Sequence, residues 1–243
     1  MNGLIGWWNG LWDGLAGWWS DLSATFEKCF IREDRYMLLL DGIGVTIKIS
    51  LLAIVIGIAI GLLIAFCNLS KRKLVNFFGK VYTDVIRGTP SVTQLMIIYF
   101  VVFATVDLEK WIIAAIAFGI NSGAYVSEII RAGILSIDKG QSEAGRSLGL
   151  NAAQTMVHIV IPQAVKNIFP ALCNEFIVLI KETAIVGYIG LVDIQKAGDF
   201  IKSNTFEAFM PLIATAVIYF VLIKILTVIM TYIEKSLRKS EAR

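Results

Sequence analysis

The sequence has little of what a metal site, a disulfide framework or a nucleotide-binding site requires. It contains one histidine, His158, and three cysteines that lie far apart and form no CxxC pair: Cys29, Cys67 and Cys173. A zinc site and a disulfide framework are therefore not expected. No GxxxxGK[ST] stretch occurs, so the chain lacks the usual loop that cradles the phosphates of ATP. No arrangement of nucleophile and base is apparent either, and we expect no catalytic residue, no metal ligand and no cofactor held by this chain.

Charged residues are also scarce, and long apolar runs take their place. Only 17% of the residues are charged, 57% are apolar, and the mean hydropathy is +0.73. These values are typical of a multi-pass membrane protein, and a chain of this length has room for about five spans of roughly 20 residues. We predict an all-α membrane protein with spans near residues 46–66, 91–105 with a polar approach from 81, 111–130, 156–180 and 208–233.

The basic residues between these spans predict the orientation of the chain. Eleven lie in segments that five spans would place on one side: Lys71, Arg72, Lys73, Lys80, Arg131, Lys139, Arg146, Lys235, Arg238, Lys239 and Arg243. Six lie on the other: Lys28, Arg32, Arg35, Lys110, Lys196 and Lys202. Because cytoplasmic loops carry the excess of Lys and Arg, we expect the N-terminus outside and the C-terminus in the cytoplasm. The net charge of +3 gives no reason to expect a nucleic-acid partner.

The first 36 residues form a tryptophan-rich leader with an unusual composition. Five of the six tryptophans lie within the first 19 residues and recur with leucines at three- and four-residue steps. Such a pattern predicts an amphipathic helix that lies in the membrane interface, in contact with lipid. A contact with a partner on the outer face is the alternative. Residues 37–243 are then the transmembrane domain.

A polar segment at residues 138–162, here called the coupling segment, lies between the third and fourth predicted spans. Its first part, with Glu143, Arg146 and Ser147, predicts a short helix on the cytoplasmic side. Gly149 permits a tight turn with positive φ, and Asn151 is a good N-cap for the next helix. Pro162 then predicts a kink where that helix enters the bilayer.

This segment resembles the motif by which permease subunits of ABC importers are identified. The motif begins Glu-Ala-Ala and continues with Gly, Ile and Leu-Pro at fixed spacing, and five residues match it: Glu143, Ala144, Gly149, Ile159 and Pro162. Gly145 replaces the second Ala, which we expect to loosen the first turn slightly, and Ile161 replaces Leu. The resemblance implies that Glu143, Ala144, Arg146 and Gly149 couple the chain to an ATPase. An ordinary amphipathic loop helix is the alternative.

Three further blocks resemble the polar amino acid permeases of the histidine, glutamine and arginine type, and they lie at residues 87–100, 122–141 and 181–194. The resemblance implies a type I ABC importer permease fold in the bacterial cytoplasmic membrane. It also implies several partners: an ABC ATPase that binds ATP and Mg²⁺, a second permease copy or paralogue, an extracytoplasmic solute-binding protein that reaches outer loops including residues 187–207, and an amino acid substrate.

Polar residues inside the spans are candidates for the substrate pathway, because charge at bilayer depth is costly unless it faces protein or water. Glu175, Lys181 and Glu182 lie near the outer part of the fourth span, and a Lys and a Glu in one cavity would match both ends of an amino acid. On a regular helix Glu175 and Lys181 point about 120° apart, so they converge only if the helix unwinds or the ligand bridges subunits. Lys181 and Glu182 could instead be solvated ends.

Other polar residues lie in the second and third spans. Thr89 and Gln94, beside Pro90, are further pathway candidates or hydrogen-bonding links between helices. Asn121 and Ser122, beside Gly119 and Gly123, indicate close helix packing. Glu128 and Arg131 are spaced to form an ion pair.

The function that these features favour is the membrane subunit of an ATP-driven polar amino acid importer. An ion-coupled secondary transporter would be expected to show an inverted repeat and an acidic coupling site within the membrane, and no such repeat is visible. A membrane scaffold protein is favoured only by the tryptophan-rich leader.

Overall fold

The structure is a computed structural model that describes residues 17–239, and every regular element in that part of the chain is helical. The elements that follow residue 26 are η1 (Glu27–Ile31), η2 (Arg32–Asp34), α2 (Tyr36–Leu69), α3 (Lys73–Arg87), α4 (Ser91–Ile97), η3 (Ile98–Val102), α5 (Lys110–Leu135), α6 (Lys139–Ser147), α7 (Ala152–Thr155), η4 (Met156–Val160), α8 (Ile161–Glu182), η5 (Thr183–Ile189), α9 (Ile194–Thr205) and α10 (Phe209–Lys239). The all-α prediction is therefore confirmed for the described residues.

The pairing of α2 and α5 forms the centre of the bundle, and glycines allow the two backbones to approach. A Cβ atom at Gly61 of α2 would lie 2.5 Å from Cγ1 of Val126, and one at Gly119 of α5 would lie 2.6 Å from Cγ2 of Ile56. In lipid the hydrophobic effect does not drive helices together, so their association depends on close van der Waals packing. Small residues permit that packing. The close packing expected around Gly119 and Gly123 is present.

The second predicted span is a broken helix. α3 and the continuous pair α4–η3 are bent by 104° at a short break that contains Thr89 and Pro90. Pro90 has no N–H to continue the helix, and the residue before a proline is disfavoured in helical conformation. The break predicted at Thr89 and Pro90 is thus present, and the polar approach from residue 81 belongs to a separate helix.

Three helices among the described residues are long and apolar enough to cross a membrane: α2, α5 and α10 through Ser236. The bent pair of α3 with α4 and η3 raises this number to four if it is a single span. The residues of the predicted fourth span form η4 and α8 in the structure. Neither is among the helices that are long and apolar enough to cross a membrane. α8 has 22 residues, which is long enough, but it carries Gln163, Lys166, Asn167, Asn174, Glu175 and Lys181 and is correspondingly less apolar.

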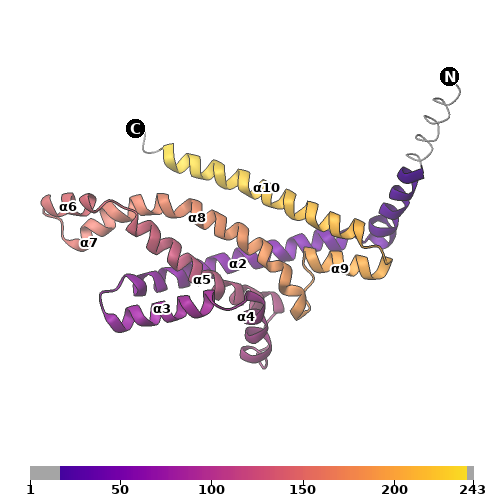
Figure 1. The fold of residues 1–243 in the computed structure, drawn as a ribbon, viewed down its shortest axis with the longest axis horizontal. Coiled ribbons are helices and arrows are strands. Elements are labelled where there is room, and N and C mark those ends of the chain that lie inside the picture. The colour runs from indigo at the N-terminus through magenta and orange to yellow at the C-terminus, as the bar shows by residue number, and fades with distance from the viewer. Residues whose placement is uncertain (1–16, 240–243) are drawn as a thin grey trace, which may run out of the picture.

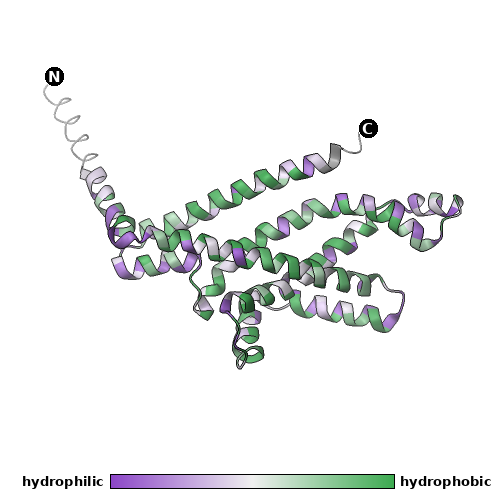
Figure 2. Ribbon diagram, turned by 180° about the vertical axis from the view of Figure 1, so that it is seen from behind, coloured by the Kyte–Doolittle hydropathy of each residue, from purple (hydrophilic) through white to green (hydrophobic). Residues whose placement is uncertain are grey.

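The helices give the molecule two distinct ends (Figure 1). The turn between α2 and α3, the helices α6 and α7, and the C-terminal part of α10 lie toward one end, and α9 lies near the start of α2 at the other. Figure 2 shows α2 and α10 as largely hydrophobic ribbons, whereas hydrophilic residues gather at α6 and α7. The segments that carry most of the basic residues therefore share one end.

The leader is described only from residue 17 onward, so most of its tryptophans lie outside the described residues. Residues 17–26 are helical, and Trp18 and Trp19 are exposed. The next turn, η1, buries Cys29 and Phe30 in a cluster with residues of α2 and α9. This part of the leader is consequently packed onto the bundle.

Candidate coupling element and polar cavity

The coupling segment is a pair of short helices with complete caps. Asp138 begins α6 by accepting a hydrogen bond from the Gly140 N–H at 2.6 Å. At the other end of α6, Gly149 has a φ of 84°, the Leu150 N–H donates to the Gly145 carbonyl, and the Gly149 N–H donates to the Arg146 carbonyl. These two bonds are a Schellman motif, which requires a left-handed residue after the helix. The turn predicted at Gly149 is confirmed.

A capping box begins the second helix of the segment. The Asn151 side chain accepts from the Gln154 N–H at 2.9 Å, and the Gln154 side chain accepts from the Asn151 N–H at 2.9 Å. The N-cap predicted at Asn151 is therefore present, and its reciprocal partner Gln154 is a residue that the sequence interpretation missed. Its signal is the glutamine three residues after an N-cap asparagine.

The helix that follows contains a π turn immediately before Pro162. The residues of η4 form bonds between residues five apart, including one from the Ile161 N–H to the Met156 carbonyl. Proline lacks an N–H and crowds the preceding turn, and a π turn is one of the ways in which a helix accommodates this. Pro162 then lies in the first turn of α8, where a proline is tolerated.

Gly145 makes a close contact between helices that its sequence position did not indicate. It is the one buried residue of α6, and a Cβ atom there would lie 2.8 Å from Cγ2 of Thr155 and 2.9 Å from Cδ1 of Ile159. The glycine therefore lets α6 lie directly on α7 and η4. This packing role is additional to the slight loosening of the first turn expected from the sequence, which stays a prediction.

The residues that were predicted to couple are exposed, three on α6 and one in the turn that follows it. Glu143, Ala144, Arg146 and Gly149 are all exposed. Leu148 is 79% exposed at the tip of the segment, although it is apolar. The sequence interpretation missed this residue, and its signal is a leucine directly before the capping glycine of an otherwise polar helix.

The interior of the bundle contains a line of hydrogen bonds between Thr89 and Asn121. The Gln94 side-chain amide donates to the Thr89 hydroxyl at 2.5 Å and to the Ile86 carbonyl at 2.7 Å. The Asn121 amide donates to Oε1 of Gln94 at 2.9 Å. Gln94 thus closes the break between α3 and α4 and joins it to α5.

The next residue of α5 continues this line to α8. Ser122 Oγ donates to Oε1 of Glu175 at 2.8 Å, and Glu175 is only 8% exposed. Adjacent residues of α5, Asn121 and Ser122, therefore hold side chains from α4 and α8. Ser122 also packs against Gly57 of α2, so it serves both close packing and polar contact.

A cavity of about 800 Å³, here called the polar cavity, lies beside Glu175 between α3, α5 and α8. Arg87 and Glu128 also line it. The Arg87 guanidinium lies 5.2 Å from the ring centroid of Tyr125, within the range of a cation–π contact. Glu128 forms the predicted ion pair with Arg131, at 2.8 Å between Nη2 and Oε2.

The structure separates Glu175 from Lys181 on α8, whereas the Glu182 carboxyl group stays within electrostatic reach of Glu175. α8 is helical from Ile161 to Glu182, so the helix does not unwind between Glu175 and Lys181. Lys181 is exposed at the end of the helix, and neither Lys181 nor Glu182 lines the polar cavity. The basic side chain that shares a cavity with Glu175 is Arg87, which the sequence interpretation did not single out.

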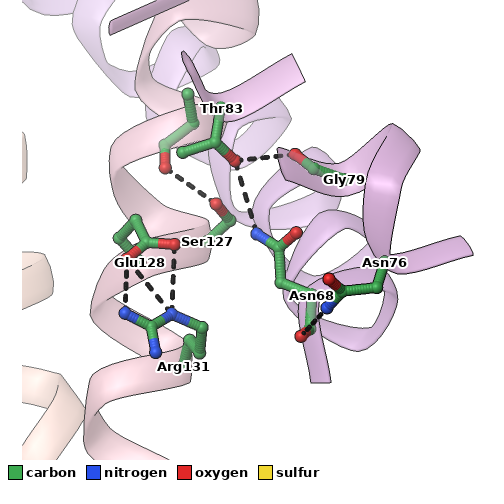
Figure 3. Close-up of polar contacts among 8 residues, drawn as sticks. Asn68, Asn76, Gly79, Thr83, Ser127, Glu128 and Arg131 are labelled. Carbon is green, nitrogen blue, oxygen red and sulfur yellow. Dashed lines mark hydrogen bonds and ion pairs between the residues drawn. The ribbon is translucent and has the colours of Figure 1, made fainter. Parts of the chain in front are cut away.

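A second polar cluster holds the ends of α2 and α3 together (Figure 3). The Asn76 amide donates to the Asn68 carbonyl at 2.6 Å, and the Asn68 amide donates to Thr83 Oγ1 at 3.3 Å. Gly79 packs against Asn68 so closely that a Cβ atom would lie 2.3 Å from Oδ1. The turn between α2 and α3 is fixed by these contacts.

Comparisons with known proteins agree with this architecture. Residues 57–239 match the model of the family described as binding-protein-dependent transport system inner membrane component. The chain is 40% identical over 214 residues to a putative glutamine transport system permease protein GlnP of Rickettsia bellii (strain RML369-C), covering 87% of this chain and 98% of that protein. It is 41% identical over 205 residues to the arginine transport system permease protein ArtQ of Bacillus subtilis (strain 168), covering 84% and 94%.

Solved structures show the same likeness. A crystal structure of an amino acid ABC transporter with histidines matches with a TM-score of 0.78 and 42% identity, over 85% of this chain and 98% of that one. An inward-facing structure of the MetNI methionine ABC transporter matches with a TM-score of 0.72 over 83% of this chain and 96% of that one. At 18% identity, the second likeness concerns the fold alone.

Proposed function

The chain belongs to the family of inner membrane components of binding-protein-dependent transport systems, and we propose that it is the permease subunit of an ATP-driven importer of polar amino acids. The observation that carries this proposal is the family match over residues 57–239 together with relatives that are named as glutamine and arginine permeases. The exposed coupling segment gives the family match a physical basis, because it offers a docking element at one end of the bundle.

The ATPase partner binds ATP and Mg²⁺ and docks on the exposed face of α6. Glu143 and Arg146 supply opposite charges there, and Leu148 supplies an apolar side chain that is 79% exposed. An apolar anchor within a polar rim is the usual composition of a strong contact point. The caps at Gly149 and Asn151 make the segment stiff enough to transmit a displacement to α8.

The chain spans the bacterial cytoplasmic membrane five times, with its N-terminus outside and its C-terminus in the cytoplasm. α8 is the remaining span, and its acidic residue Glu175 is acceptable there because it faces the protein interior. The common end of the turn after α2, of α6 and α7, and of the C-terminal part of α10 supports this orientation (Figure 1). The leader rests in the outer membrane interface.

The importer contains two permease subunits and an extracytoplasmic solute-binding protein. The most apolar 18-residue window of α10 is only 6% buried within the chain, which leaves its surface for lipid and for a second copy or paralogue. The binding protein docks at the end that contains η5 and α9. Lys181 and Glu182, at the end of α8 that leads into η5, lie where substrate would enter.

The polar cavity is the pathway through this subunit. A free amino acid carries a carboxylate and an ammonium group, and the cavity offers Arg87 to the first and Glu175 to the second. Thr89 and Gln94 hold the broken helix that positions the end of α3. Arg87 therefore takes the part that the sequence alone suggested for Lys181.

Reconstitution tests this function directly. Vesicles that contain this chain, its ATPase and its binding protein are expected to accumulate radiolabelled glutamine, arginine or histidine only when ATP is supplied on the cytoplasmic side. Uptake that follows an ion gradient without ATP would contradict the proposal. Omitting the binding protein provides the matched control, because the ATPase and permease remain unchanged.

A further inference from the structure

An apolar cavity separate from the polar cavity lies at the coupling end of the bundle. It has a volume of about 540 Å³ and lies between the C-terminal half of α2, the end of α5 and the beginning of η4 and α8. Every residue that lines it is apolar except Ser70, the residue that follows α2. Leu62 and Phe66, which line it from α2, are also exposed, so the cavity opens to the outside of the bundle.

A basic run directly follows Ser70, the polar edge of this apolar cavity, which is here called its mouth. Ser70 is followed directly by Lys71, Arg72 and Lys73, and all three basic residues are exposed. Consecutive Cα atoms are about 3.8 Å apart, so this basic run begins at the edge of the cavity. Within residues 17–239, none of these three side chains forms an ion pair.

The same position is the N-terminus of a 15-residue helix. α3 begins at Lys73, and its first turn receives no hydrogen bond from a capping side chain. Unpaired N–H groups and the helix dipole make such a terminus favourable for a phosphate. The basic side chains and the helix terminus therefore favour the same ligand, an anion at the mouth of an apolar cavity.

The hydrogen bonds of the second polar cluster keep this arrangement in place. The Asn76 amide donates to the Asn68 carbonyl at 2.6 Å (Figure 3). The Arg72 N–H donates to Ser70 Oγ at 3.2 Å. The turn that carries the basic run is thus tied to the helix that lines the cavity. The turn with the basic run and the part of α2 that lines the apolar cavity therefore form one hydrogen-bonded unit.

We propose that this unit binds an anionic phospholipid, with an acyl chain in the apolar cavity and the phosphate at the first turn of α3. A phospholipid combines an apolar tail and an anionic head in one molecule, which is the combination that the cavity and its mouth present. Juxtamembrane basic residues attract anionic lipid in the same way. The proposal goes beyond amino acid transport, and its readout does not depend on transport.

The test is lipid retention by the full-length chain in the assembly that purifies with it. The protein is equilibrated with an equimolar mixture of phosphatidylglycerol and phosphatidylcholine of identical acyl chains, and the lipid retained after delipidation is measured by native mass spectrometry. We expect phosphatidylglycerol to be retained about tenfold more than phosphatidylcholine. Equal retention of the two lipids would overturn the proposal.

Two variants separate the head site from the tail site. Lys71→Gln combined with Arg72→Gln removes two exposed charges and is expected to abolish the preference for phosphatidylglycerol. Val165→Trp fills the cavity and is expected to lower retention of both lipids. Lys224→Gln combined with Lys235→Gln removes two exposed charges from α10 and should leave the preference unchanged.

The remaining outcomes identify another occupant. An equal loss of preference in the α10 control would mean that general surface charge, and not this site, attracts the lipid. If Val165→Trp disrupts association between two copies of the chain and leaves lipid retention unchanged, a second copy occupies the cavity. Either result contradicts the proposal.

Discussion

The coupling segment and the polar interior are both held by hydrogen bonds, but the bonds span very different distances along the chain. In the coupling segment the capping bonds join residues within five positions, as between Asn151 and Gln154 or Leu150 and Gly145. In the interior, Ser122 and Glu175 are 53 positions apart, and Gln94 and Asn121 are 27 apart. The first region is consequently an independent local structure, whereas the second exists only when several helices have packed.

The largest effect is expected at the tip of the coupling segment. Leu148→Asp places a charge where an apolar side chain is exposed for docking, and loss of such an anchor costs about 2 kcal/mol of binding free energy, or about thirtyfold in affinity. The affinity of the ATPase for the permease in detergent measures this change. Leu148→Met keeps an apolar side chain and is the matched control. Unchanged ATPase affinity in Leu148→Asp would exclude the tip from the interface.

The second effect concerns the polar interior. Glu175→Ala removes the acceptor of the Ser122 hydroxyl and the acidic group of the polar cavity, and a bond to a charged group contributes about 1.5–3 kcal/mol. We expect the initial rate of ATP-driven uptake to fall about tenfold or more. Glu175→Gln keeps an oxygen acceptor for Ser122 but removes the charge, so it separates the two roles.

These two Glu175 variants can contradict the pathway assignment. If Glu175→Gln transports normally and only Glu175→Ala is impaired, Glu175 is a packing residue and its charge does not serve the substrate. Glu27→Gln, which changes an exposed acidic residue of η1 outside the polar cavity, is the control and should change uptake less than either variant.

The two regions were predictable to different degrees, and the reason is the sequence separation of their contacts. Gly149 and Asn151 could be assigned because turns and caps depend on neighbouring residues. The pairing of Ser122 with Glu175 depends on how α5 faces α8, which no local pattern specifies. For the same reason Lys181, which is close in sequence, was predicted as the basic partner of Glu175, and Arg87, which is close only in space, was not considered.

Even within the coupling segment, one contact between helices could not be predicted. From the sequence, Gly145 was expected only to loosen the first turn of its own helix. The structure adds a close contact of Gly145 with Thr155 and Ile159 on the elements that follow. The break at Thr89 and Pro90 was predictable because proline acts locally, but the 104° bend at that break was not. Gln94 was recognised as a polar residue, but its hydrogen bonds across the break, to the Ile86 carbonyl and the Thr89 hydroxyl, could not be predicted from the sequence.

A third, intermediate effect is expected from a substitution at the contact of Gly145 with Thr155 and Ile159. Gly145→Ala forces a Cβ atom against Thr155 and Ile159, and overpacking of this kind typically costs about 1–3 kcal/mol. We expect faster hydrogen exchange in α6 and α7 and weaker coupling of ATP hydrolysis to uptake. Gly44→Ala is the control, because a Cβ atom at Gly44 of α2 meets nothing within 4 Å and should not destabilise. Equal hydrogen exchange in both variants would contradict the packing role.

The smallest effect is expected at the capping box. Asn151→Ala removes the acceptor of the Gln154 N–H and should destabilise the beginning of α7 by about 1 kcal/mol. Hydrogen exchange at Gln154 measures the change, which should stay local and leave the Ser122–Glu175 region as protected as before. Loss of protection in both regions would show that the two are not independent.

The measurement that tests the central claim most directly is the ratio of amino acid uptake to ATP hydrolysis in reconstituted vesicles with Glu143→Ala and Gly149→Ala combined. Gly149 has a φ of 84°, a conformation that glycine adopts more easily than other residues. The Gly149→Ala substitution alone is therefore expected to destabilise this turn by roughly 1 kcal/mol. If residues 138–162 transmit ATP hydrolysis to the bundle, uptake per ATP hydrolysed falls sharply while the helices of the membrane domain remain folded. Unchanged uptake together with unchanged ATPase association would contradict the account.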